Sequence, residues 1–266
     1  MSSMEEGNYI KFLGTAGARY VVAKQLRASA GVFLNLKGKK IILDPGPGTL
    51  VKCAASRPKI ETGTLDAIIL SHIHIDHTND VNVLIDAMTE GGLKRRGILF
   101  APDECLNGDN AVVLKYLRAF PEEIVTLRES HTFRLGDLSF STSMKLDHNV
   151  ETYGMKFDLG DRKLSFIVDT RYFADLIEEF KGSDILVLNV VRHSTGDKIG
   201  VQTFDIPHLS LDDAKNILSR IKPKKAILTH FGMTMLRAKP WEVARTVTEE
   251  IGIEVIAASD GMRIDL

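Results

Sequence analysis

The chain has 266 residues, of which 44% are hydrophobic, and a formal net charge of −1. This length suffices for a large buried core, and the balanced charge excludes a general electrostatic attraction to nucleic acid. With only two cysteines, a disulfide framework or a thiolate zinc site is not expected, which indicates a reducing cytoplasm. The sequence shows neither a signal-peptide pattern nor a run of about 18 apolar residues. We therefore expect a soluble cytoplasmic protein with no membrane partner.

Short runs of β-branched and aromatic residues alternate with amphipathic stretches along the chain. Strands are predicted at residues 9–13, 32–36, 40–43, 65–70, 98–101, 124–127, 133–144, 152–157, 163–168, 185–190, 226–228 and 254–257. Helices are predicted at residues 79–88, 173–180, 211–221 and 241–251. This order of strands and helices indicates two sheets packed between helices. Because no linker or low-complexity tract interrupts the pattern, residues 1–266 are expected to form a single domain.

The strand predicted at residues 65–70 ends at a dense group of metal-binding side chains, in the run Ser71-His72-Ile73-His74-Ile75-Asp76-His77. His72 and His74 are two residues apart in extended chain, so their imidazoles project to the same side and can bind one metal ion. Asp76 and His77 fall where the chain turns helical, and their side chains are expected to diverge toward a second ion. The alternative is solvated loop histidines, or a core histidine with a satisfied partner. The density of ligands favours half of a two-metal hydrolytic site.

With this motif the chain resembles the metallo-β-lactamase-fold hydrolases over nearly its whole length. Its motifs are closest to those of the ribonuclease Z and phosphodiesterase branch. The resemblance implies an α/β fold, an αββα four-layer sandwich of two mixed β-sheets flanked by helices. In the redox-active branch that carries a di-iron site the second motif position is usually Glu, whereas this chain has His74. A hydrolytic member of the family is therefore expected.

The same resemblance implies three further metal ligands at later strand ends. His148 would complete the set begun by His72 and His74. Asp169 would bridge the two ions, and His230 would join the second set. The implied ligands are thus His72, His74, Asp76, His77, His148, Asp169 and His230. Imidazoles and carboxylates in this ratio suit zinc best, although such sites also accept manganese or iron, so the expected cofactor is two divalent metal ions with zinc favoured.

Two further residues are implied as supporting groups. Asp44 ends a strand in a glycine-rich turn, where the resembling family uses an Asp to hold a metal-site histidine by its distal nitrogen. A helix cap or a turn carboxylate is the alternative for Asp44. His208 and Ser210 resemble the His-Ser/Thr element of the ribonuclease Z and phosphodiesterase branch, in which the histidine contacts the scissile phosphate or protonates the leaving oxygen. Ser210 is alternatively only the N-cap of the next helix.

These residues imply hydrolysis by a hydroxide that bridges the two ions and attacks the substrate. We expect His208, Asp76 and Asp169 to act catalytically, with Asp169 positioning the hydroxide and His208 assisting the leaving group. The chain is interpreted as a phosphodiesterase that acts on a small or cyclic phosphodiester or a short nucleic acid. A lactone or thioester hydrolase with the same metal site is the first alternative. A sensing or scaffold protein that retains metal without turnover is the second.

Five residues are candidates for substrate contacts. The cations Lys94, Arg95 and Arg96 follow the helix that leaves the motif, where they either recognise phosphate or form a solvated turn. Arg27 lies in the long first loop, where related phosphodiesterases often carry an Arg near the pocket. His193 lies in a loop that borders either the pocket or solvent.

The chain departs from the transfer-RNA 3′-processing enzymes in one respect. Those enzymes carry a long Gly/Pro-rich arm between the later His and the bridging Asp, or an equivalent arm elsewhere, whereas only 20 residues lie between His148 and Asp169. A small-molecule or short oligonucleotide phosphodiester is therefore the expected substrate. Resembling enzymes commonly form homodimers, although no apolar stripe or heptad pattern in this sequence indicates one.

Overall fold

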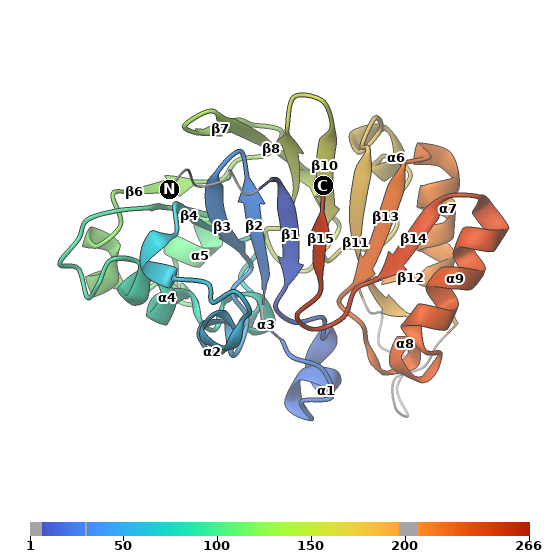
Figure 1. Ribbon diagram of the computed structural model, residues 1–266, viewed down its shortest axis with the longest axis horizontal. Coiled ribbons are helices and arrows are strands. Elements are labelled where there is room, and N and C mark those ends of the chain that lie inside the picture. Colours follow the sequence, from blue (N-terminus) through green and yellow to red (C-terminus); the bar gives the residue numbers. More distant parts are fainter. Residues whose placement is uncertain (1–6, 30, 197–206) are drawn as a thin grey trace.

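Two β-sheets form the centre of the molecule (Figure 1), of which the computed structural model describes residues 7–29, 31–196 and 207–266. The first sheet has seven strands, in the order β15 (Arg263–Asp265), β1 (Tyr9–Phe12), β2 (Val32–Leu36), β3 (Lys39–Leu43), β4 (Ala67–Ile69), β5 (Ile98–Ala101) and β6 (Glu123–Thr126). Its strands are antiparallel from β15 to β3 and parallel from β3 to β6. The motif that begins at Ser71 thus follows an interior strand, β4.

The second sheet is mixed in the same way. Its order is β14 (Glu254–Ala257), β13 (Lys225–Thr229), β11 (Ile185–Arg192), β10 (Lys163–Ile167), β9 (Tyr153–Asp158), β8 (Leu138–Lys145) and β7 (Thr132–Leu135), with the short β12 (Leu209–Ser210) paired to β11. The strands are parallel from β14 to β10 and antiparallel from β10 to β7. Strands β10 and β13 end just before the segments that carry Asp169 and His230.

Helices cover the outer faces of the two sheets (Figure 1). On the first sheet lie α2 (Thr49–Ala55), α4 (Val81–Met88), α5 (Asp103–Leu106) and the 3-10 turns η1 (Thr62–Thr64) and η2 (Lys115–Ala119). On the second sheet lie α6 (Leu176–Glu179), α7 (Leu211–Ile221) and α9 (Pro240–Ile251). Three short helices, α1 (Ala18–Ala23), α3 (Ile75–Thr78) and α8 (Met233–Arg237), follow strand ends. The predicted αββα sandwich of two mixed sheets is therefore confirmed.

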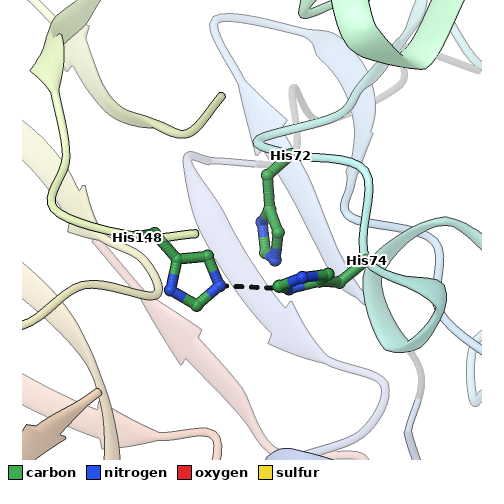
Figure 2. A group of neighbouring side chains, drawn as sticks. All are labelled: His72, His74 and His148. Atoms are coloured by element: carbon green, nitrogen blue, oxygen red, sulfur yellow. Dashed lines mark hydrogen bonds between the residues drawn. The ribbon is translucent and has the colours of Figure 1, made fainter. Parts of the chain in front are cut away.

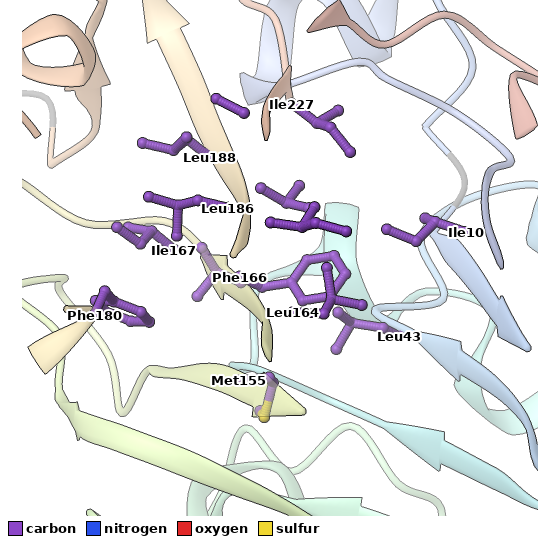
Figure 3. Close-up of a cluster of buried hydrophobic side chains, with 14 of the residues drawn as sticks. Ile10, Leu43, Met155, Leu164, Phe166, Ile167, Phe180, Leu186, Leu188 and Ile227 are labelled. Atoms are coloured by element: carbon purple, nitrogen blue, oxygen red, sulfur yellow. The ribbon is translucent and has the colours of Figure 1, made fainter. Parts of the chain in front are cut away.

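The main core fills the space between the sheets. Figure 3 shows part of it, where Phe166 and Leu186 of the second sheet belong to the same cluster as Ile10 and Leu43 of the first. All four side chains are buried, and this removal of apolar surface from water is the chief favourable term in folding. Close packing between the sheets holds the strand ends, and so the side chains that follow them, in a fixed arrangement.

Some elements differ from the sequence prediction. The strand predicted at residues 133–144 is a hairpin, β7 and β8, because Gly136 takes a left-handed φ of 59° and turns the chain. The helix predicted at residues 173–180 is limited to α6. Strand β15 pairs with β1 from the opposite end of the chain, a contact that no local pattern reveals. The short helices α1, α2 and α8 were not predicted either, because five to seven residues carry too little periodicity.

No helix in the described ranges is long and apolar enough to cross a membrane. Residues 1–6, part of the N-terminal segment predicted to lack a signal peptide, lie outside the described residues. The cytoplasmic location stays a prediction.

Candidate metal centre

The seven predicted ligands come together where strands of both sheets end. The ligand atoms of His72, His74 and His148, here called the three-histidine set, lie within 4.8 Å of one another. Those of Asp76, His77 and His230, here called the Asp-His-His set, do the same. Both sets combine the loop and helix after β4 with a loop of the second sheet. The fold therefore builds two potential ion sites from segments that are far apart in sequence.

In the three-histidine set the imidazole rings converge (Figure 2). His148 Nε2 lies 3.0 Å from His74 Nδ1, and His148 Nδ1 lies 3.0 Å from the Pro207 carbonyl oxygen. A carbonyl oxygen only accepts, so His148 Nδ1 carries the hydrogen and its Nε2 presents a lone pair. If His74 carries its hydrogen on Nδ1, this nitrogen donates a hydrogen bond to His148 Nε2. If His74 carries its hydrogen on Nε2, the two facing nitrogens both present lone pairs, as two ligands of one metal ion do. The Pro207 contact thus sets the tautomer that a metal ligand needs.

Asp169 lies between the two sets and is almost completely buried. Its Oδ2 lies 3.2 Å from His77 Nε2 and 3.8 Å from His72 Nε2, and its Oδ1 lies 3.3 Å from His230 Nε2. His208 approaches the same carboxylate, with Nδ1 3.6 Å from Oδ2. One carboxylate therefore contacts members of both sets and the predicted catalytic histidine.

The donor atoms fit divalent metal ions. Four buried ring nitrogens have no hydrogen-bond partner among the described residues, namely His72 Nε2, His77 Nε2, His230 Nε2 and His208 Nδ1. Leaving a buried polar atom unsatisfied costs about 1–3 kcal/mol each, so such atoms rarely gather without a shared ligand. Imidazole nitrogens and carboxylate oxygens are the ligands that zinc, manganese and iron accept.

Asp44 supports one histidine of each set. Its Oδ2 lies 3.0 Å from His77 Nδ1, which is the predicted contact with the distal nitrogen of a motif histidine. Ser71 donates to Asp44 through its backbone N–H and its hydroxyl, both at 2.7 Å, and Ser71 Oγ lies 2.9 Å from His72 Nδ1. Because the hydroxyl gives its only hydrogen to the carboxylate, it must accept from His72 Nδ1, which leaves His72 Nε2 with its lone pair.

The two sets differ in proton affinity. Burial lowers the pKa of His72 well below its ordinary value and that of His148 to about 4. Burial acts in the same direction on His77, but the carboxylates of Asp169 and Asp76 outweigh it and raise the pKa of His77 well above its ordinary value. Without metal, the lowered pKa values of His72, His74 and His148 favour their neutral forms, whereas the raised pKa of His77 favours its doubly protonated form.

Two glycines let loops close onto the ligand segments. A Cβ on Gly17 would lie 2.0 Å from the His230 carbonyl oxygen, and a Cβ on Gly46 would lie 2.0 Å from that of Asp76. His230 itself has a left-handed φ of 61°, uncommon for a residue other than glycine. The loops after β1 and β3 thus press against the backbone of two candidate ligands.

The cationic turn formed by Lys94, Arg95 and Arg96 does not lie at the candidate centre. Arg96 Nη2 donates to the Leu65 carbonyl at 3.0 Å, which precedes β4, whereas the motif follows that strand. Lys94 forms an ion pair with Glu90 at 2.6 Å, and Arg95 donates to backbone carbonyls. The phosphate-recognition hypothesis for this turn is wrong, because these groups are occupied at the opposite end of the strand.

The other two candidates for substrate contact have different surroundings. Arg27 donates to Thr15 Oγ1 at 3.1 Å, and its guanidinium lies 6.0 Å from the ring centroid of Phe231, the residue after a candidate ligand. His193 is exposed, and its backbone N–H donates to Thr234 Oγ1 at 3.1 Å. Contact with substrate stays a prediction for both residues.

Ser210 is the N-cap of α7. Its hydroxyl accepts from the Asp213 N–H at 3.2 Å, and Asp213 Oδ2 accepts from the Ser210 N–H at 2.8 Å, which forms a capping box. The N-cap alternative is therefore confirmed. The cap fixes the start of α7 at Leu211, three residues after His208.

Asn189 is a contact that the sequence analysis missed. Its side-chain amide donates to Asp169 Oδ1 at 2.9 Å. The available signal was an amide side chain in strand β11, which is apolar apart from Asn189 and its terminal Arg192, because a partly buried amide favours a hydrogen-bond partner.

Comparisons with known proteins agree with this fold. A family model described as the beta-lactamase superfamily domain matches residues 39–231. An uncharacterized protein of Methanocaldococcus jannaschii is 30% identical, over 97% of this chain and 94% of the relative. Ribonuclease Z of Clostridium tetani is 24% identical, over 84% of this chain and 88% of the relative.

Solved structures extend the likeness. The metallo-beta-lactamase fold protein YhfI from Bacillus subtilis has a TM-score of 0.77 at 19% identity, covering 97% of this chain and 99% of YhfI. A diphosphatase from the PhnP family has a TM-score of 0.71 at 20% identity, covering 97% of each chain. The predicted metallo-β-lactamase fold and kinship with ribonuclease Z are confirmed, which supports the predicted hydrolase class. The chain belongs to the β-lactamase superfamily.

Proposed function

We propose that this chain is a phosphodiesterase with a two-ion centre, and that its substrate is a small or cyclic phosphodiester or a short nucleic acid. The observation that carries the proposal is the convergence of both ligand sets and of His208 on the single carboxylate of Asp169. The ribonuclease Z relative and the diphosphatase neighbour favour a phosphate ester over a lactone or thioester.

The three-histidine set would hold one divalent ion and the Asp-His-His set the other, with Asp169 shared between them. Ions bound there would supply Lewis-acid chemistry, that is, acidification of water and neutralisation of charge on phosphoryl oxygens. Five imidazoles against two carboxylates favour zinc as the resident metal, with manganese or iron as substitutes. A homodimer stays a prediction.

His208 would serve the reaction rather than the metals. Its side chain is 12% exposed, and its backbone carbonyl accepts from Arg192 Nη2 at 2.9 Å, which anchors the loop before α7. Histidine is the side chain that most often transfers protons in catalysis. Held beside Asp169 at the edge of the centre, His208 is placed to protonate the leaving oxygen of the substrate.

The test is a substrate panel on protein that has been stripped of metal and reloaded with zinc, manganese or iron. We expect hydrolysis of bis-p-nitrophenyl phosphate, with little turnover of lactones or thioesters. Turnover of a lactone but not of the phosphodiester would replace the proposal with the lactonase alternative. Full metal loading without turnover of any substrate would favour a sensing or scaffold protein.

A further inference from the structure

Strand β11 is apolar along its length apart from Asn189 and its terminal Arg192. Asn189 is half-buried, and an amide that is partly withdrawn from water is stabilised by a hydrogen bond. Asn189 Nδ2 donates this hydrogen bond to Asp169 Oδ1, at 2.9 Å. Since β11 lies between β10 and β13, the amide comes from the strand between those that deliver Asp169 and His230.

The chemistry of the partners fixes the direction of this bond. A carboxylate has no hydrogen to give, so the amide must present its NH2 group and not its oxygen. The two oxygens of Asp169 have different surroundings. Oδ1 accepts from Asn189 and lies 3.3 Å from His230 Nε2, whereas Oδ2 faces His72 Nε2 at 3.8 Å and His77 Nε2 at 3.2 Å.

We propose that Asn189 is a positioning residue of the metal centre, which holds Oδ1 of Asp169 and so fixes the orientation of the carboxylate that the two ions would share. This inference rests on the proposed two-ion centre. Without the amide, the carboxylate can rotate and exchange its oxygens, and the two ligand sets would lose the fixed orientation of their shared carboxylate. Groups that orient metal ligands in this way typically contribute about 10–100-fold in metal affinity.

The decisive variant is Asn189→Leu, which keeps a similar volume and removes the donor. Stripped protein is titrated with zinc against a chromophoric chelator, and the cobalt-substituted protein is examined by its visible absorption spectrum. We expect the zinc dissociation constant to rise by about 10–100-fold. The cobalt spectrum should change as well, because the geometry around the shared oxygen relaxes.

A matched control is Asn35→Leu. Asn35 is a buried amide in β2 of the other sheet, and its Nδ2 donates to the Gly7 carbonyl at 3.1 Å. This variant should lose folding stability, as Asn189→Leu does, but keep wild-type zinc affinity and the wild-type cobalt spectrum. The comparison separates a general loss of a buried hydrogen bond from an effect on the metal centre.

Wild-type zinc affinity and cobalt spectrum in folded Asn189→Leu would overturn the inference. If that variant does not fold, Asn189→Ser decides, because the shorter hydroxyl does not reach Oδ1. The same loss of affinity is expected for Asn189→Ser, and wild-type affinity would again overturn the inference. Failure of the proposed centre looks different, since the wild-type protein itself would then bind less than about one ion.

Discussion

The two ligand sets of the centre lie side by side, yet they are built differently. The three-histidine set has no carboxylate of its own, and burial lowers the pKa of His72 and His148. In the Asp-His-His set, neighbouring carboxylates raise the pKa of His77 despite its burial. An ion entering the first set meets neutral imidazoles, whereas an ion entering the second must displace a proton. The difference shows that two sets of similar ligands can differ in the number of protons that metal binding releases.

Removing Asp169 should weaken metal binding at both sets, because this carboxylate contacts members of each. Asp169→Ala is expected to lower the metal content from about two ions per chain to under about one, and to reduce turnover to background. Elemental analysis of the reloaded variant measures the first effect. Asp161→Ala, which changes an exposed carboxylate in the loop before β10, is the control and should retain its metal. Unchanged stoichiometry in Asp169→Ala would refute bridging.

Removing His208 should leave both sets intact and affect only the reaction. His208→Ala is expected to lower phosphodiester turnover by about 10²–10⁴-fold with near wild-type metal content, because His208 is proposed not to be a ligand. Turnover and metal analysis of the same preparation provide the test. His131→Ala, an exposed histidine on β7's preceding loop, should change neither quantity. Loss of metal in His208→Ala would contradict the proposed role.

Removing the Ser71 hydroxyl should affect the three-histidine set more than its neighbour. Ser71→Ala takes away the acceptor at His72 Nδ1 and one of the two Ser71 donors to Asp44. The backbone N–H of Ser71 still holds the other oxygen of Asp44, so the contact between Asp44 and His77 should weaken less. We expect one of two zinc dissociation constants to rise by about 10–100-fold while the other stays close to wild type. A chelator titration resolves the two steps. An equal loss in both steps would show that Ser71 supports the centre as a whole.

The two sets should differ in how their metal affinity depends on pH. Release of one proton on binding changes the apparent affinity by about tenfold per pH unit. The raised pKa of His77 means that the metal-free group is protonated at pH 7, so affinity at the Asp-His-His set should fall as the pH falls. His148, with a pKa of about 4, imposes no such loss until much lower pH. Calorimetric titration in two buffers of different ionisation enthalpy counts the protons released in each step. Equal proton release in both steps would contradict the proposed difference in proton affinity between the two sets.

The structure brings the candidate ligands together at strand ends, although their binding of metal stays a prediction. His72 follows β4 and belongs to a dense local motif, whereas Asp169 after β10 and His230 after β13 were implied by the resemblance. The resemblance to a known family then supplied the pairing of the later residues with the motif.

The contacts that orient these ligands could not be predicted in the same way. Pro207 is 59 residues from His148, and Asn189 reaches Asp169 only because their strands are neighbours in the folded sheet. The sequence left two interpretations open for the turn with Arg96 for a related reason, because composition does not say how far a cation lies from the motif in the folded chain. The pairing of strands in the folded sheets decides both the orienting contacts and the place of this turn.

The central claim is a two-ion centre shared through Asp169, and the most direct test is a metal titration of stripped wild-type protein with simultaneous assay of bis-p-nitrophenyl phosphate hydrolysis. The account predicts that activity rises until about two ions are bound per chain and is constant thereafter. Binding of less than about one ion under every loading condition, or full activity at about one ion, would contradict it.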